Sequence, residues 1–484
     1  MSSNGPNSGA PFTAETYQNE YLAAGVDTVD AVVTVSAAGD PTVDATATAG
    51  PGDRAEIIVV DTSGSMGAAR KMTEAKAAAM AAVDCLDDGV AFAIIAGNHV
   101  AQLIWPTDGR AFAVASPEDR SRAREAISRL AADGGTAIGT WLDLARQLFS
   151  STLAASRHAI LLTDGRNEHQ QPGELHMAVE SCRGLFQCDC RGVGVDWEVD
   201  ELRGVATALL GTVDIVADAG DLTADFEAMI TSSQSRALPD VRLRLWAPQG
   251  AVIESLRQVA PEVLDLTATG TPSPQGPLAR DFLLGGWTPG EVRDYHVRIT
   301  VRPGAVGDEM LAGRVSLVLA DGSVATQALV KAVWTDDTEL STRMDRHVAH
   351  YTGQEEMADA IQAGLAAAKA GDERTATVKL GRAAQLAQES GHEDTVKLLA
   401  KVVDIDADSG TVRLRKGADK AAEMTLDTRS TRTVRLGKPK AGSGAGDEAG
   451  DAGGGGGEAG GGGAAGAGSG AGGAEGAEAG GGGA

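Results

Sequence analysis

The spacing of apolar positions changes twice along this chain, and the changes divide it into three kinds of structure. Between residues 53 and 235, short apolar runs that suit buried parallel strands alternate with longer segments of helical period. Between residues 237 and 335 the period is two, which predicts antiparallel strands. Between residues 339 and 404 the period is helical again. The pattern predicts a multidomain chain: an α/β Rossmann-like domain, an antiparallel β-sandwich and a small α-helical hairpin or bundle.

The α/β segment alternates strands with helices, as expected for a largely parallel sheet. Strands are predicted at 55–60, 91–96, 100–105, 159–163, 188–195 and 213–216. Helices are predicted at 68–86, 117–132, 138–150, 173–183, 199–209 and 222–232. The second and third strands are joined through Gly97-Asn98, which predicts a hairpin and hence one antiparallel edge strand.

Four further segments flank these three. Residues 1–24 are predicted to be a flexible N-terminal arm, and residues 25–45 contain a strand that is expected to join the β domain. The α/β domain would then be inserted between this strand and the rest of its sheet. Residues 405–440 carry a short strand-like extension. The Gly/Ala-rich acidic tail at 441–484 offers too little apolar surface to fold and is predicted to be disordered.

Carboxylate and hydroxyl side chains gather at the predicted strand ends. Asp61-Thr62-Ser63-Gly64-Ser65 follows a buried strand, Thr136 precedes a helix after two glycines, and Thr163-Asp164-Gly165 ends a second strand. Open α/β sheets bind ligands outside the carboxyl ends of their strands. Hard oxygen ligands at such a place suit a small hard cation such as Mg²⁺. Taken alone, the first motif could equally be a turn that caps the following helix.

Asp-x-Ser-x-Ser, a later Thr and Thr-Asp-Gly, in that order, resemble the von Willebrand factor A (VWA) family over residues 53 to 235. That family is known for a metal-ion-dependent adhesion site. The resemblance implies a Mg²⁺ site, with Mn²⁺ or Ca²⁺ as alternatives, completed by an Asp or Glu of a protein partner. The implied metal ligands are Asp61, Ser63, Ser65, Thr136 and Asp164. Arg166, Asn167 and Glu168 would form a partner-binding rim, although a solvated loop is the plainer interpretation.

Composition limits the classes of partner. The formal net charge of −25 argues against nucleic acid and against an anionic membrane surface, because both need a basic face. We expect no membrane span, since no stretch of 18 or more apolar residues occurs, and no secretion signal. A cytoplasmic location is therefore the default expectation. Abundant Ala and Gly with few Lys suggest a bacterial source of high GC content.

The sequence gives little support for a cysteine-based metal or redox site or for a catalytic activity. Cys182, Cys188 and Cys190 form no Cys-x-x-Cys pair and are expected to be buried small hydrophobic residues. The chain has neither a Walker-type loop nor a Gly-x-Ser-x-Gly elbow, so we expect no ATPase or serine hydrolase activity. The prediction is a non-catalytic, metal-dependent protein-binding protein. Two alternatives stay open: an accessory VWA subunit of an ATPase or chelatase-like assembly, and a signalling scaffold whose metal is only structural.

Overall fold

The computed structural model describes residues 11–39, 50–68, 70–171, 173–405, 412–415 and 419–436. The start of the predicted arm and the tail predicted at 441–484 lie outside these residues. None of the helices in the described part combines the length and the apolarity that crossing a bilayer requires.

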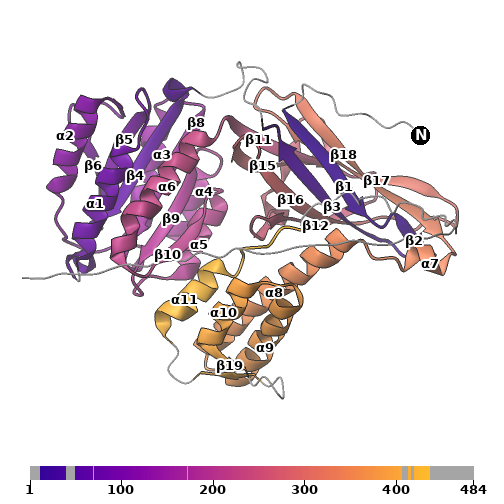
Figure 1. Cartoon of the computed structure of the whole chain (residues 1–484). Coiled ribbons are helices and arrows are strands. Elements are labelled where there is room, and N and C mark those ends of the chain that lie inside the picture. Colours follow the sequence, from indigo (N-terminus) through magenta and orange to yellow (C-terminus); the bar gives the residue numbers. More distant parts are fainter. Residues whose placement is uncertain are drawn as a thin grey trace, which may run out of the picture. The chain divides into compact units, whose positions relative to one another are not determined.

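Seven strands form the mixed sheet of the α/β domain, in the order β10-β9-β8-β4-β5-β6 with β7 also beside β5 (Figure 1). They are β4 (Arg54–Asp61), β5 (Ala91–Gly97), β6 (Ala101–Trp105), β7 (Ala113–Val114), β8 (Ser156–Thr163), β9 (Gln187–Val193) and β10 (Val213–Val216). Strands β4, β5, β8, β9 and β10 run parallel, whereas β6 and β7 run antiparallel to β5. The predicted hairpin and its antiparallel strand are therefore confirmed.

Six helices cover the two faces of this sheet. They are α1 (Lys71–Asp84), α2 (Pro117–Ser128), α3 (Ile138–Ser150), α4 (Glu174–Cys182), α5 (Val199–Ala208) and α6 (Leu222–Ser235). Ile57 and Val59 pack with α3, α4 and α5, whereas Ile58 and Val60 pack with α1, α2 and α6. Because alternate residues of a strand point to opposite faces, a strand buried on both sides needs an unbroken apolar run, as β4 has.

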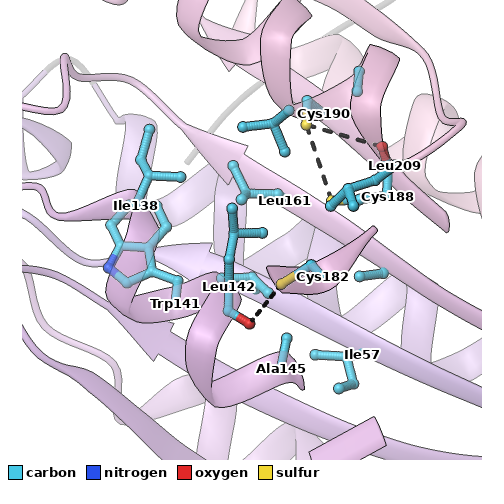
Figure 2. Close-up of a cluster of buried hydrophobic side chains, with 14 of the residues drawn as sticks. Ile57, Ile138, Trp141, Leu142, Ala145, Leu161, Cys182, Cys188, Cys190 and Leu209 are labelled. Atoms are coloured by element: carbon cyan, nitrogen blue, oxygen red, sulfur yellow. Dashed lines mark hydrogen bonds between the residues drawn. The ribbon is translucent and has the colours of Figure 1, made fainter. Parts of the chain in front are cut away.

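Three of the four cysteines belong to the first of these cores (Figure 2). Cys182, Cys188 and Cys190 are fully buried among apolar side chains that include Leu142 and Leu161. The Cys182 thiol donates to the Leu142 carbonyl at 3.5 Å, and burial raises its pKa to about 11. A thiol with that pKa stays protonated at neutral pH, which agrees with the predicted packing role.

Two further sheets share one apolar core. The five-stranded sheet has the order β1-β3-β16-β12-β13, and the six-stranded sheet has the order β14-β15-β11-β17-β18-β2. The first consists of β1 (Phe12–Gln18), β3 (Thr28–Ala37), β12 (Val252–Ala260), β13 (Leu264–Asp265) and β16 (Val292–Thr300). The second consists of β2 (Tyr21–Ala23), β11 (Leu238–Trp246), β14 (Thr271–Ser273), β15 (Gly276–Trp287), β17 (Glu309–Val318) and β18 (Val324–Thr335). Pairing is antiparallel except between β2 and β18.

The expectation of a flexible arm is wrong for residues 12–23, which form β1 and β2. Phe12 is 1% exposed and packs edge-on against Trp287, with ring centroids 5.2 Å apart. Leu22 belongs to the same core. These apolar anchors are widely spaced among polar residues, so they produced no clear strand period in the sequence.

Helices dominate the C-terminal part. They are α7 (Thr338–Ser341), α8 (Arg346–Lys369), α9 (Glu373–Glu389), α10 (Glu393–Val402) and α11 (Lys420–Arg429), with the short strands β19 (Val403–Ile405) and β20 (Val412–Leu414) between the last two. The strand-like extension predicted for residues 405–440 is confirmed by β20 but is incomplete, because the segment also contains helix α11. Met424 packs into the α/β core and Leu426 into the helical core, so α11 is apolar on two sides and lacks a single helical stripe.

Candidate metal centre

Three loops meet at the carboxyl edge of the α/β sheet, and backbone hydrogen bonds hold them together. Asp61 ends β4, and the loop after it is bonded through Thr62 N to the Gly97 carbonyl at 2.6 Å. The amide of Gly64 donates to the Gly134 carbonyl at 2.8 Å, which ties this loop to the one before α3. The third loop follows Thr163, the last residue of β8. The parallel strands β4 and β8 thus bring two of the motifs to one edge of the sheet, and the loop before α3 brings Thr136 to the same place.

Hydroxyl and carboxylate oxygens lie close together at this junction. The hydroxyls of Ser63 and Ser65 are 3.0 Å apart, and Ser65 donates to Asp164 Oδ1 at 2.6 Å. The Thr136 hydroxyl faces the same point, since a Cβ added to Gly165 would lie 3.0 Å from it and 3.6 Å from Ser65 Oγ. Four of the predicted ligand residues therefore surround one small volume, and Gly165 leaves that volume open.

The carboxylate of Asp61 stabilises the loop that follows β4. Its Oδ1 accepts from the Ser63 amide at 2.7 Å, and its Oδ2 accepts from the Thr163 hydroxyl at 2.5 Å. The side chain is fully buried. Burial raises the pKa of Asp61, and the charge of Asp164 adds to this effect, while the hydrogen bonds from Thr163 and Ser63 oppose it.

The alternative, in which these residues only cap a helix, fits the contacts poorly. Residues Gly64–Gly67 form a turn of 3₁₀ helix, and Ser63 at its start makes no side-chain capping bond. Helix α1 begins only at Lys71, after Arg70, which also makes no side-chain capping bond. The Asp61–Ser63 contact is a local turn, but the serine hydroxyls point to each other and to Asp164 instead of to the helix.

Two histidines, His99 and His169, pack against the loop before α3. A Cβ on Gly134 would collide with the ring of His99, and a Cβ on Gly135 would fall inside the ring of His169. Gly134 also adopts a φ of +76°, which other residues rarely take. His169 Nδ1 accepts from the Thr136 amide at 3.2 Å. The two glycines therefore serve the close approach of these imidazoles.

The predicted rim residues have different roles in the structure. Asn167 points inward: its Oδ1 accepts from the Ile138 amide at 2.8 Å and so caps α3. Arg166 pairs with Glu198 at 2.9 Å. Glu168 is exposed and is free to face a partner. Only part of the predicted rim is thus available at the surface.

Lys71 is a member of the site that sequence reasoning missed. Its ammonium lies 2.7 Å from Asp164 Oδ2 and 3.7 Å from Asp196 Oδ2. The lysine side chain is 13% exposed and Asp164 is fully buried. A basic residue at the start of the helix that follows Asp-x-Ser-x-Ser was the available signal, but its direction depends on where α1 begins.

The donor set fits a hard divalent cation, because it consists of oxygens only and is open on one side. Two carboxylates and three hydroxyls contribute to it. In the described residues, this site included, no three His, Cys, Asp or Glu side chains gather where they could hold a metal ion, so the candidate site depends on its hydroxyls as well as its two carboxylates.

A parallel sheet with an antiparallel edge, covered by helices on both faces and carrying this oxygen cluster at its carboxyl edge, is typical of a VWA domain. The comparisons agree. Residues 56–215 match the family described as von Willebrand factor type A domain, and residues 385–430 match the von Willebrand factor type A C-terminal domain. The chain belongs to the von Willebrand factor type A family.

Two solved structures are similar over most of the chain. A von Willebrand factor type A protein from Catenulispora acidiphila is 47% identical, with 90% of this chain and 99% of that chain covered and a TM-score of 0.83. The ArnB paralog VWA2 from Sulfolobus acidocaldarius is 14% identical, with 88% and 98% covered and a TM-score of 0.53, which shows similarity of fold alone. Among curated proteins, none matches this sequence.

Proposed function

We propose that this chain is a non-catalytic protein that binds a divalent cation, Mg²⁺ foremost, at the carboxyl edge of its VWA domain and uses it to bind an acidic residue of a protein partner. The observation that carries the proposal is the contact between the three side chains of Ser63, Ser65 and Asp164, at 3.0 and 2.6 Å, beside the Thr136 hydroxyl. Oxygens from three separate loops converge here.

Each side chain has a distinct task in this proposal. Ser63, Ser65 and Thr136 would hold the cation with neutral oxygens, while Asp61 and Asp164 would supply charge and orient hydroxyls. A bound cation held largely by neutral oxygens would remain electrophilic and accept a carboxylate oxygen from outside. Because the loops are fixed by backbone hydrogen bonds, little ordering would be needed on binding.

The rest of the chain would position this edge. We infer that the two antiparallel sheets form a β-sandwich and that the C-terminal helices lock it to the VWA domain. The core that the two sheets share supports the sandwich. Two ion pairs support the attachment: Arg203 of α5 with Asp427 of α11 at 2.6 Å, and His296 of β16 with Glu355 of α8 at 3.2 Å. An accessory subunit of an ATPase or chelatase-like assembly would dock through the same edge, whereas in the scaffold alternative the metal would be only structural.

Calorimetric titration of the full chain with MgCl₂ tests the proposal. We expect binding by the wild type, loss of binding in Asp61→Ala, and weaker binding in Thr136→Val, which removes one hydroxyl at nearly constant volume. Asp108→Ala is the matched control, because Asp108 is an exposed aspartate of the same domain that pairs only with Arg110. Equal binding by the wild type and Asp61→Ala would overturn the proposal.

A further inference from the structure

The carboxylate of Asp164 already has a positively charged side chain beside it, the ammonium of Lys71. Its Oδ1 accepts from the Ser65 hydroxyl, and its Oδ2 lies 2.7 Å from the Lys71 ammonium. Both carboxylate oxygens are therefore engaged by this chain itself. With Asp61 and Asp164 as its acids, the site carries a formal charge of about −1 when Lys71 is counted, not the −2 that its carboxylates alone would give.

The placement of Lys71 is built into the fold. Arg70, which precedes it, adopts a left-handed conformation with a φ of +65°, an uncommon conformation for a residue other than glycine. Gly194 packs against the aliphatic part of the lysine side chain, since a Cβ added to this glycine would lie 3.5 Å from Lys71 Cε. The other lysine of α1, Lys76, instead reaches the Ser128 carbonyl at the surface. Lys71 is thus directed to Asp164 by its backbone and by its packing.

We propose that Lys71 sets the cation affinity of this site: its ammonium shares Asp164 with any divalent cation and opposes the binding of that cation. The inference rests on the metal site of the proposed function and adds its regulation. A cation on Asp164 would feel the lysine charge at short range, where screening by salt is weak. The loaded site would carry net positive charge, which favours an incoming carboxylate. Metal and acidic partner should then strengthen each other's binding.

Mg²⁺ titration of the full chain with Lys71→Met tests this inference. Methionine keeps most of the stem but removes the charge, so we expect the dissociation constant to fall by roughly tenfold or more relative to the wild type. Lys71→Arg keeps the charge and should bind like the wild type. Lys76→Met, on the same helix but away from the carboxylates, should also bind like the wild type. Lys71→Gln is the second neutral variant should Lys71→Met fail to fold.

Thermal unfolding gives an independent readout. In EDTA, Lys71→Met should melt below the wild type, because the buried Asp164 carboxylate then lacks its positive neighbour. Added Mg²⁺ should raise the melting temperature of Lys71→Met by more than that of the wild type. Neither effect is expected for Lys76→Met.

The outcomes separate this inference from the proposed function. Equal and finite affinities in the wild type, Lys71→Met and Lys71→Gln would overturn the role of Lys71 and leave the metal site standing. Weaker binding in both neutral variants would also overturn it. No binding by any of these proteins at millimolar Mg²⁺ would overturn the metal site, and the inference with it.

Discussion

A buried histidine at the amino ends of the central strands links the stability of the VWA domain to pH. His158 of β8 lies between two carboxylates: its Nδ1 is 2.7 Å from Glu56 of β4, and its Nε2 is 2.8 Å from Asp189 of β9. All three side chains are less than 5% exposed. Burial by itself would lower the pKa of His158, but Glu56 and Asp189 outweigh burial and raise the pKa to about 9.

The direction and size of the effect follow from that pKa. An unfolded histidine has a pKa of 6.5, so the folded state binds the proton more tightly. The stabilisation is complete below about pH 6.5 and is lost as the pH rises through about 9. At about 1.4 kcal/mol for each pH unit, the imidazolium contributes roughly 3 kcal/mol.

The assay compares the wild type with His158→Gln by urea unfolding at pH 6.5 and pH 10. At pH 6.5 the variant should be less stable by about 3–5 kcal/mol, because Glu56 and Asp189 lose their cation. At pH 10 the difference should shrink by roughly 3 kcal/mol, since the wild-type imidazole is then neutral as well. A difference that is the same at both pH values would refute the reasoning. Groups that titrate in both proteins cancel in this comparison, and Mg²⁺ affinity at neutral pH should be unchanged in any folded variant.

Two further substitutions, the second with a matched control, test the loops of the site. Gly97→Ala should destabilise the protein by about 1–3 kcal/mol in thermal or urea unfolding, because the new Cβ would lie 2.5 Å from the ring of Trp141; unchanged stability would contradict the close approach. Asn167→Ala should cost roughly 1 kcal/mol, since it leaves the Ile138 amide at the start of α3 without its acceptor, whereas Glu168→Ala should change stability by less than about 0.5 kcal/mol. Equal effects of these two alanines would rule out the capping role of Asn167.

The α/β domain could be predicted closely because its signals are local. A strand buried on both faces needs a continuous apolar run, and the Gly-rich turns and helical stripes between such runs lie in the same short stretch of sequence. Predicted and observed elements differ mainly at their ends. The helix expected from residue 68 begins at Lys71, because Gly64–Gly67 first make a 3₁₀ turn around Ser65.

Segments with non-local partners could not be predicted in this way. Strand β1 is stabilised by pairing with β3 and by the contact of Phe12 with Trp287, which is 275 positions away. Helix α11 is apolar on two sides because it lies between two cores, so its sequence shows no single helical stripe and the helix was not predicted. In both cases the burial that selects the element comes from parts of the chain that a local period cannot report.

In the candidate site, too, some residues could be predicted from local sequence signals and others could not. Its oxygens could be predicted because parallel strands must bring their carboxyl ends together, whichever residues those ends carry. The contribution of Lys71 could not be predicted. Its position depends on the 3₁₀ turn and on the left-handed Arg70, which together place the first residue of α1 at Lys71. In the proposed metal site, this lysine would change the charge that a cation meets. The motif therefore predicts which oxygens gather at this edge of the sheet, whereas the charge beside them depends on a neighbour that only the folded chain supplies.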